Sequence, residues 1–510
     1  MVEKAKLVDL YLGDIDGETE VAKCKNFYNL FYCQKEVIDS IINGDKYVII
    51  GRKGTGKTLL AHYVKKKIDE QSTKFFCKVC GSNEINLQKL LEIGDSTILI
   101  NQYETYWEYT IYTLIANIIL ENTSKLVKIL PSYTYRILKK FVENKTDSFK
   151  IIDYVKKSNS DNKIGASLNN ITIATKLSRG TDVRYAKARF FDKLKRLKKL
   201  IFKQLKDNRV ILIIDELDCL NISTKMDKNY IKCISSLLNT SKKINNEFSN
   251  ENFKSKIIIL LRDDIITYLN ENDSNTNKSI CCKDIVLDWW DTVDYNFPYK
   301  HPLMKMILLK IKNSNSYYKN KTDKEIYKTI FPKHVAGKDV LTYLLDNSFG
   351  RPRDIISYLN IIRDKEKSST TFDPKYFKMY KRYYYKSFFN ELKNEISIHE
   401  NAPMLNDALK LLRDYKKTSF LFREIEDYFE NNKEYYTNID NLKEAIRCMY
   451  YQGILGNLWT RIVTNVEGTT TKKSYISWYY KTNLDPEPYP NFSNKFIVHK
   501  ALLSNLSIRN

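Results

Sequence analysis

The fold class of the chain follows from KYVIIGRKGTGKT, residues 46–58. A short apolar run with β-branched residues precedes the glycines, and LLAHYVKKKI after them has helical spacing. A strand, a glycine loop and a helix in this order form a phosphate cradle, because glycine lets backbone N–H groups turn inward around an anion. The stretch therefore predicts an α/β fold with a parallel sheet that binds a nucleoside triphosphate.

The loop satisfies the pattern G-x-x-x-x-G-K-[ST]. In this pattern Lys57 reaches the β- and γ-phosphates of ATP, and the hydroxyl of Thr58 completes the coordination of Mg²⁺. The predicted cofactor-binding residues of the loop are Gly51, Arg52, Lys53, Gly54, Thr55, Gly56, Lys57, Thr58 and Leu59.

Two carboxylates follow the apolar run VILII at residues 210–214. The magnesium shell of a P-loop needs a carboxylate at the end of a neighbouring strand, where Asp215 stands. An ionised Glu216 next to it suits a general base that polarises the attacking water. The pair predicts ATP hydrolysis, with Thr58 and Asp215 at the metal and Glu216 and Lys57 as catalytic residues. The alternative is a helix cap or a surface pair at a strand end.

Arginines close the next apolar run, KIIILL, and recur in the turn GRPRD. Arg262 is predicted near the γ-phosphate, where fixed cations stabilise developing charge. The structural alternative is an ion pair with Asp263, Asp264 or another carboxylate. In GRPRD, Arg351 and Arg353 are candidates to connect a lid with the phosphates, and the alternative is that both are ordinary arginines at a helix start.

A chain of 510 residues exceeds the usual size of one hydrophobic core, which favours two or three domains. We predict a P-loop NTPase core over 1–300, with a parallel sheet sandwiched by helices. A helical lid follows over 301–395. Residues 396–510 are predicted as three helices and a pair of strands, a pattern typical of a winged-helix domain.

Within the core the periodicity of apolar residues predicts individual elements. Helices are predicted over 27–43, 101–121 and 184–206, strands over 46–51, 210–218 and 256–264, and an exposed hairpin over 163–176. The helix over 184–206 carries ten Lys or Arg and one acid. It is either a surface helix with a solvated basic face or a track for nucleic acid.

Lys and Arg total 84 against 61 Asp and Glu, a formal net charge of +23, which favours phosphate-rich partners. No apolar segment reaches membrane length and no secretory signal is evident, so we expect a cytoplasmic protein. Nine scattered cysteines argue against a disulfide scaffold. Cys77 and Cys80 are half of a zinc-ribbon pattern without a second half, and ordinary thiols are the alternative.

With Walker A at GRKGTGKT, Walker B at IIDELD, an arginine in LLRDD and GRPRD before the tail, the chain resembles AAA+ and STAND ATPases. It looks closest to the stand-alone, origin-recognition-like P-loop ATPases of bacteria, over most of residues 26–510. The resemblance implies that Arg262 is the sensor 1 residue, Arg353 the sensor 2 arginine and Pro352 the GxP proline near adenine. Sensor 1 is a polar residue such as Asn in many AAA+ proteins, which leaves the subfamily open.

Two functions compete. The first is an ATP-driven switch or motor whose winged helix contacts nucleic acid, DNA above all. The second is a regulatory ATPase that controls a separate effector protein, as similar bacterial proteins in phage-defence systems are thought to do. A small-molecule kinase fits less well, because compact kinases need neither GRPRD nor a winged tail. The expected partners are ATP with Mg²⁺, nucleic acid or an effector protein, and copies of the same chain, without a membrane.

Overall fold

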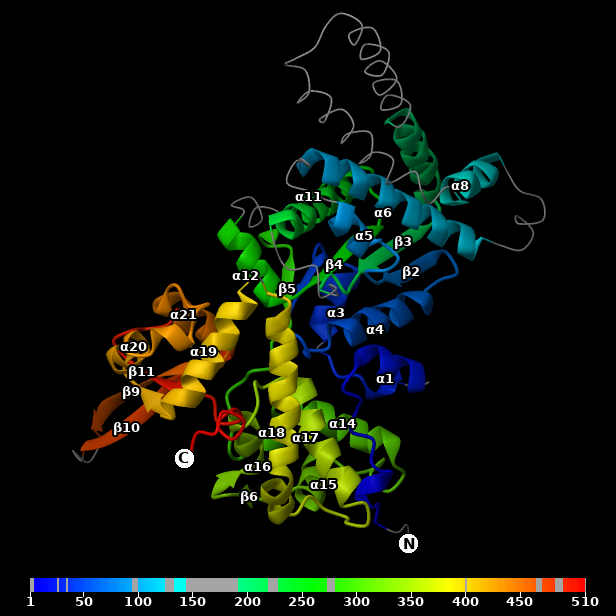
Figure 1. Cartoon of the computed structure of the whole chain (residues 1–510). Coiled ribbons are helices and arrows are strands. Elements are labelled where there is room, and N and C mark those ends of the chain that lie inside the picture. Colours follow the sequence, from blue (N-terminus) through cyan, green and yellow to red (C-terminus); the bar gives the residue numbers. More distant parts are fainter. Residues whose placement is uncertain are drawn as a thin grey trace, which may run out of the picture. The chain divides into compact units, whose positions relative to one another are not determined.

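The computed structural model describes residues 4–24, 27–33, 35–93, 100–123, 133–143, 191–218, 228–272, 280–399, 401–464, 470–481 and 489–509 (Figure 1). Internal contacts divide the chain into two compact units. The sheet unit holds residues 33–52 and 60–287, and the helical unit holds residues 1–32, 53–59 and 288–510. The domain boundaries predicted near 300 and 395 stay a prediction.

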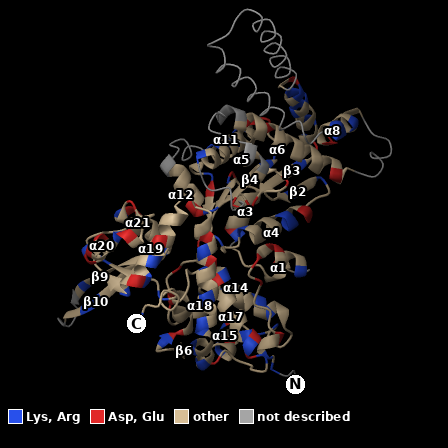
Figure 2. Ribbon diagram, viewed as in Figure 1, with Lys and Arg blue, Asp and Glu red and all other residues tan. Residues whose placement is uncertain are grey.

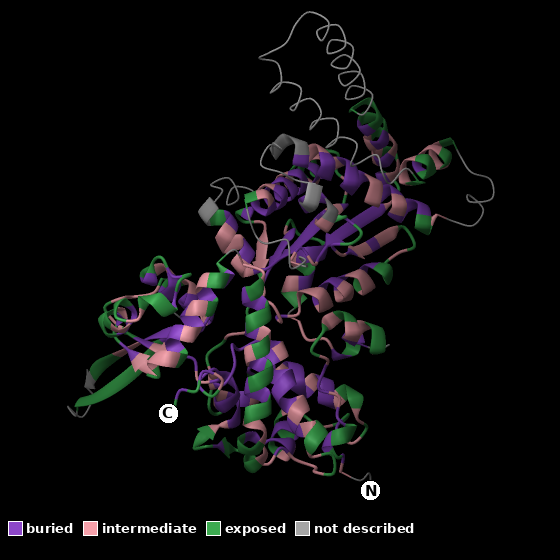
Figure 3. Cartoon of the chain, viewed as in Figure 1, coloured by how far each residue is buried: buried purple, intermediate pink, exposed green. Residues whose placement is uncertain are grey.

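The sheet unit is built on a five-stranded parallel sheet in the order β2-β3-β4-β1-β5. Its strands are β1 Val48–Ile50, β2 Phe75–Cys80, β3 Arg209–Ile214, β4 Lys256–Leu261 and β5 Asp284–Val286. All residues of β1 and β3 are buried (Figure 3), as expected for strands that are covered on both faces. Such burial requires continuous apolar runs, which is why the sequence predicts these strands.

Helices cover both faces of this sheet. The long helices α6 and α11 pack against each other on one face, and α4 lies on the other face (Figure 1). The helices around the sheet are α3 Lys35–Ile42, α4 Lys57–Asp69, α5 Leu87–Ile93, α6 Ile100–Asn122, α8 Tyr133–Glu143, a helix over 191–205, α11 Lys228–Asn250 and α12 Asp263–Asn272. This parallel sheet between two layers of helices confirms the predicted α/β fold class.

The predicted core elements have different outcomes. The strands in 46–51, 210–218 and 256–264 and the helix over 101–121 are confirmed. Two strands are not predicted from the sequence: β2, whose side chains are mostly half-buried, and β5, which has three residues. Outside the described residues lie the predicted hairpin at 163–176 and the first part, 184–190, of the predicted basic helix.

The single helix predicted over 27–43 is wrong. The structure has two short helices there, α2 Phe27–Leu30 and α3. The chain passes from the helical unit to the sheet unit after Tyr32. The apolar residues of α2 therefore pack in the helical unit and those of α3 pack in the sheet unit. One straight helix with a single apolar face cannot do both.

The helical unit has one continuous hydrophobic core, formed by the N-terminal segment, the central helices and the C-terminal part. Its first elements are η1 Leu7–Asp9, α1 Gly17–Lys23, α2, η2 Pro298–Lys300, α14 Pro302–Ser314, α15 Asp323–Ile330, β6 His334–Val335, β7 Lys338–Asp339, α16 Val340–Asp346, α17 Pro352–Lys365 and α18 Pro374–Ser397. The predicted helical character of residues 301–395 is confirmed.

The C-terminal part contains the predicted three helices and paired strands. Its elements are α19 Ala402–Tyr415, β8 Ser419–Phe420, α20 Phe422–Glu430, η3 Lys433–Tyr435, α21 Leu442–Tyr451, β9 Leu455–Thr464, β10 Thr470–Ser477, η4 Tyr479–Lys481 and β11 Lys495–Val498. The strands form an antiparallel sheet in the order β10-β9-β11-β8. Among the described helices of the whole chain, none is long and apolar enough to cross a membrane.

Candidate nucleotide-binding site

The glycine loop runs from the end of β1 to the first residue of α4, Lys57. Gly54 has φ of +85° and Gly56 has φ of +91°. These angles lie in the left-handed region that side chains rarely adopt, so the loop needs glycine at both positions. A Cβ atom on Gly54 would also lie 2.9 Å from Cβ of Arg353. The loop backbone is therefore tightly packed on one side.

Three consecutive carbonyl groups of this loop accept hydrogen bonds. The oxygen of Lys53 accepts from Nη1 of Arg351 at 3.0 Å, and that of Gly54 accepts from the backbone N–H of Arg353 at 3.3 Å. The oxygen of Thr55 accepts from Nε1 of Trp289 at 2.9 Å.

A trans peptide directs its C=O and the next N–H to opposite sides. Since the carbonyls of residues 53–55 are held toward these donors, the N–H groups of Gly54, Thr55 and Gly56 point the other way. Successive N–H groups that point to one side form a nest for an anion. The geometry of the loop thus fits a polyphosphate.

The first turn of α4 lies close to the N-terminal segment. A Cβ atom on Gly17 would lie 3.3 Å from Cβ of Thr58 and 3.4 Å from Cγ of Leu59. Gly17 begins α1, whose preceding residue Asp16 caps that helix by accepting from the N–H of Thr19. Gly17 is not among the residues predicted from the sequence, although a side chain at this position would press on Thr58.

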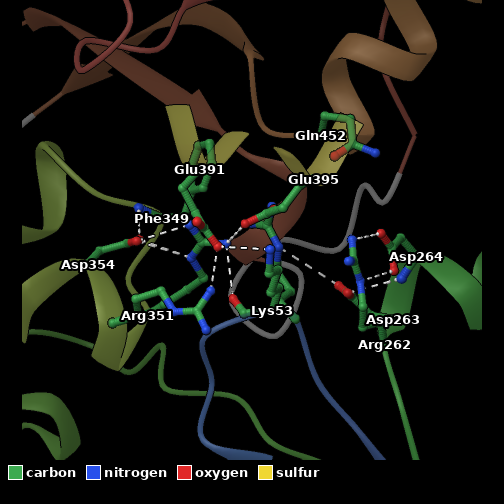
Figure 4. Close-up of polar contacts among 12 residues, drawn as sticks. Lys53, Arg262, Asp263, Asp264, Phe349, Arg351, Asp354, Glu391, Glu395 and Gln452 are labelled. Carbon is green, nitrogen blue, oxygen red and sulfur yellow. Dashed lines mark hydrogen bonds and ion pairs between the residues drawn. The ribbon is translucent and has the colours of Figure 1, made fainter. Parts of the chain in front are cut away.

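The turn GRPRD places its two arginines differently. Arg351 is 2% exposed and lies between two buried carboxylates (Figure 4). Its Nη2 lies 3.0 Å from Oδ1 of Asp354, and its Nη1 lies 2.7 Å from Oε1 of Glu395. Burial alone would lower the pKa of Arg351, but the two carboxylates outweigh it and raise the pKa above its ordinary value. Arg351 is thus a buried ion-pair centre, while Pro352 begins α17.

Arg353 shares a carboxylate with the glycine loop. Its Nη1 donates to Glu391 of α18, and its Nε donates to the carbonyl of Ile15 at 3.1 Å. The ammonium of Lys53 lies 3.0 Å from the same oxygen of Glu391 (Figure 4). Glu391 is not among the residues predicted from the sequence, because it lies 38 residues after Arg353 and gives no local signal.

In the sheet unit, the predicted carboxylates follow β3 directly. Asp215 is 6% exposed, and its Oδ1 accepts from the N–H of Glu216 at 2.8 Å. Glu216 has φ of +58°, a left-handed conformation that costs a non-glycine residue about 1 kcal/mol. Backbone strain of this kind concentrates at functional sites.

Gly81, which follows β2, lies against the carboxylate of Glu216. A Cβ atom on Gly81 would lie 2.3 Å from Oε2 of Glu216, so any side chain there would displace this carboxylate. Parallel strands end at the same edge of a sheet, and β2 pairs with β3 up to Ile214. Gly81 therefore contributes to the placement of Glu216. Unlike Glu216, Gly81 is not among the residues predicted from the sequence.

Arg262 follows β4 directly, at the same sheet edge, and is 4% exposed. Its Nε donates to Oδ1 of Asp264 at 2.9 Å (Figure 4). Its Nη1 lies 3.0 Å from Oδ2 of Asp218. The ion-pair role that we give as the alternative is thus present in the structure. Nearby, Nε of Arg52 lies 4.0 Å from Oδ2 of Asp263.

The two cysteines with zinc-ribbon spacing lie in β2 and are buried. Residues three apart on a strand point to opposite faces, which does not suit chelation of one ion. Burial raises the pKa of Cys77 above its ordinary range and that of Cys80 to about 12, whereas a metal requires the thiolate. Within the described residues, no group of three or more His, Cys, Asp or Glu side chains could hold a metal ion.

The parallel sheet, with the glycine loop after β1 and carboxylates after β3, defines the class of the protein as an α/β P-loop NTPase fold. Residues 301–393 match the FunZ-associated C-terminal helical domain, which spans α14 to most of α18. Among proteins with curated descriptions, none matches the chain. The chain is similar to the crystal structure of Cdc6p from Pyrobaculum aerophilum, with 12% identity, a TM-score of 0.33 and coverage of 89% of this chain and 93% of that chain.

Proposed function

We propose that the chain binds ATP with Mg²⁺ at residues 51–59 and hydrolyses it. The observation that carries the proposal is the hydrogen bonding of three successive loop carbonyls, which directs the following N–H groups to one side. Lys57 binds the β- and γ-phosphates, and Thr58 and Asp215 hold the metal, which neutralises phosphate charge when bound.

In hydrolysis, Glu216 accepts a hydrogen bond from the attacking water and takes its proton as the water oxygen bonds to the γ-phosphorus. The bond from this phosphorus to the bridging oxygen breaks, ADP and phosphate leave, and Glu216 releases the proton to solvent. Arg262 and Arg353 stabilise the charge that develops on the γ-phosphate, and Pro352 lies near the adenine. These roles rest on the motifs, and the left-handed backbone of Glu216 supports a special role for this residue.

The test is calorimetry of Mg-ATP binding together with the ATPase rate. Lys57→Ala is expected to abolish binding, and Glu216→Gln to keep binding but stop turnover. Lys67→Ala, which changes an exposed lysine further along α4, is the matched control and should behave as wild type. Absence of Mg-dependent ATP binding by the folded wild-type protein would overturn the proposal.

We further propose that the C-terminal part is a winged helix that acts on DNA when ATP changes the conformation or assembly of the chain. The ribbon of β9 and β10 supports this role. Arg461 lies directly opposite Lys473, and Trp459 stacks on Tyr475 at 6.1 Å between ring centroids. Like charges directly opposite each other destabilise a strand pair, so their presence favours a phosphate partner.

Duplex DNA binding at several salt concentrations tests this second part. We expect Arg461→Glu with Lys473→Glu to weaken duplex binding and to reduce the salt slope by about 2, because two phosphate contacts are lost. The ATPase rate with and without duplex, and the mass of the protein with and without ATP, report whether DNA stimulates hydrolysis and whether copies of the chain assemble.

The alternative is a regulatory ATPase that controls a separate effector protein, for example in bacterial phage defence. One observation favours it: the other face of the same ribbon exposes Ile462 by 76% and Ile476 by 42%. Exposed apolar side chains suit a protein partner better than DNA. Duplex affinity that is absent, or insensitive to salt, would favour this alternative over the first.

A further inference from the structure

Helix α18 presents two different faces. Its buried side chains are Phe377, Tyr384, Tyr385, Phe388, Leu392, Glu395 and Ile396. Exposed turns recur along the rest of the helix (Figure 3). An ordinary amphipathic helix would carry mixed charges on that side.

The exposed side of α18 carries two parallel stripes. Four cations spaced three or four residues apart form the first stripe: Lys375, Lys378, Arg382 and Lys386. Three tyrosines with the same spacing form the second stripe: Tyr376, Tyr380 and Tyr383. Residues with this spacing lie one above another on a helix. We call these seven residues the basic–aromatic face.

The cations of this face have no counter-charge of their own. Residues 374–390 hold five Lys or Arg and no Asp or Glu, while the whole chain has 84 and 61 of them (Figure 2). The excess of Lys and Arg in the whole chain therefore does not explain why residues 374–390 carry only positive charges. Within the described part of the chain, no carboxylate forms an ion pair with Lys378, Arg382 or Lys386.

The tyrosines form a ladder in which Tyr383 is exposed and Tyr376 and Tyr380 are half-buried. The ring centroids of Tyr376 and Tyr380 are 6.5 Å apart, and those of Tyr380 and Tyr383 are 6.3 Å apart. Tyr383 is 59% exposed. The ammonium of Lys375 lies 5.1 Å from the Tyr376 ring centroid, and that of Lys365 lies 5.4 Å from the Tyr383 ring centroid. A base stacked on these rings would have its phosphate close to an ammonium group.

We propose that the basic–aromatic face of α18 binds single-stranded nucleic acid. Cations that follow a backbone and aromatic rings that stack on bases are the two elements of single-strand recognition. A duplex can use only the cations, because its bases are already stacked on one another. The face is separate from the β9–β10 ribbon and from the glycine loop, so the inference goes beyond the proposed ATPase and its winged helix.

Fluorescence anisotropy with labelled oligo(dT), an RNA oligonucleotide and a duplex of the same length tests the proposal on the full chain without ATP. Lys378→Glu with Arg382→Glu is the charge variant. Lys324→Glu with Lys328→Glu is its control, because both lysines are exposed and have the same spacing on α15. Tyr383→Ala is the stacking variant, and Tyr435→Ala, at 58% exposure, is its control.

We expect wild type to bind a single strand more tightly than duplex, and Tyr383→Ala to lose about fivefold or more in single-strand affinity. The charge variant should lose more, while both controls keep wild-type affinity. Equal losses in variants and controls, or no preference for a single strand, would overturn the proposal. Circular dichroism of each variant excludes unfolding as the cause. Duplex binding that depends on Arg461 and Lys473 alone would leave the winged-helix proposal intact while this one fails.

Discussion

Oε1 of Glu391 lies 3.0 Å from the ammonium of Lys53. The same oxygen accepts from Arg353. One carboxylate on α18 thus holds a cation of the glycine loop and the arginine of the GRPRD turn. Both cations belong to the proposed phosphate site, so Glu391 competes with a triphosphate for them.

Glu391→Gln should raise the affinity for Mg-ATP, because the side chain keeps its shape and loses the competing charge. We expect about fivefold, which corresponds to the ~1 kcal/mol of a partly exposed ion pair. Calorimetry measures the change. Glu366→Gln is the control, since Glu366 accepts from Tyr380 and contacts no residue of the loop. Unchanged or weaker binding by Glu391→Gln would show that no such competition exists.

Gly54→Ala should abolish Mg-ATP binding. The new Cβ would lie 2.9 Å from Cβ of Arg353, and the residue would have to keep φ of +85°. Gly337→Ala provides a matched control, because Gly337 has φ of +80° and no atom within 4 Å of the new Cβ. Both variants should lose about 1 kcal/mol of stability from backbone strain, and only Gly54→Ala should fail in a nucleotide-binding assay.

Gly81→Ala should slow hydrolysis without weakening ATP binding, because its Cβ would displace the carboxylate of Glu216. We expect kcat to fall by about 10- to 100-fold, up to the lower end of the ~10²–10⁴-fold range for a general base, and KM to stay near wild type. Combining it with Glu216→Gln should bring no further loss, since both changes disable the same group. Additive effects in the double variant would rule out this role of Gly81.

Arg351→Met should destabilise the protein strongly. The change leaves Asp354 and Glu395 buried without a counter-charge, which costs about 3–5 kcal/mol. Arg353→Met should cost less, because Arg353 is partly exposed and Glu391 keeps its contact with Lys53. Urea unfolding compares the two variants. Equal stability of both would show that the buried ion-pair centre contributes little.

The fold is predicted well where the physical signal is local. The strands β1, β3 and β4 are buried on both faces and need uninterrupted apolar runs, which are visible in the sequence. The helices of the C-terminal part are predicted by their periodicity. Residues 27–43 are predicted wrongly, because a single apolar pattern continues across the two units and does not reveal that the chain passes from one unit to the other after Tyr32.

The candidate site divides in the same way. The glycine loop is recognisable because glycine, lysine and threonine must stand at fixed spacing in one continuous segment. The exposed charge stripe of α18 can also be identified in the sequence, once the structure shows which face of the helix is buried. The role of Arg262 is predictable only in part. Its partner Asp264 is two residues away and is named from the sequence, whereas Asp218 comes from a separate segment.

The glycine loop that is predicted to bind phosphate can be recognised from the sequence alone, because the signal lies within eight residues, from Gly51 to Thr58. The partners of the predicted site residues are known only from the tertiary structure. In the helical unit, Trp289, Arg351 and Arg353 donate hydrogen bonds to the carbonyls of the loop, and in the sheet unit Gly81 leaves space for the carboxylate of Glu216. These contacts join residues far apart in the chain, and packing in three dimensions rather than local preference selects them.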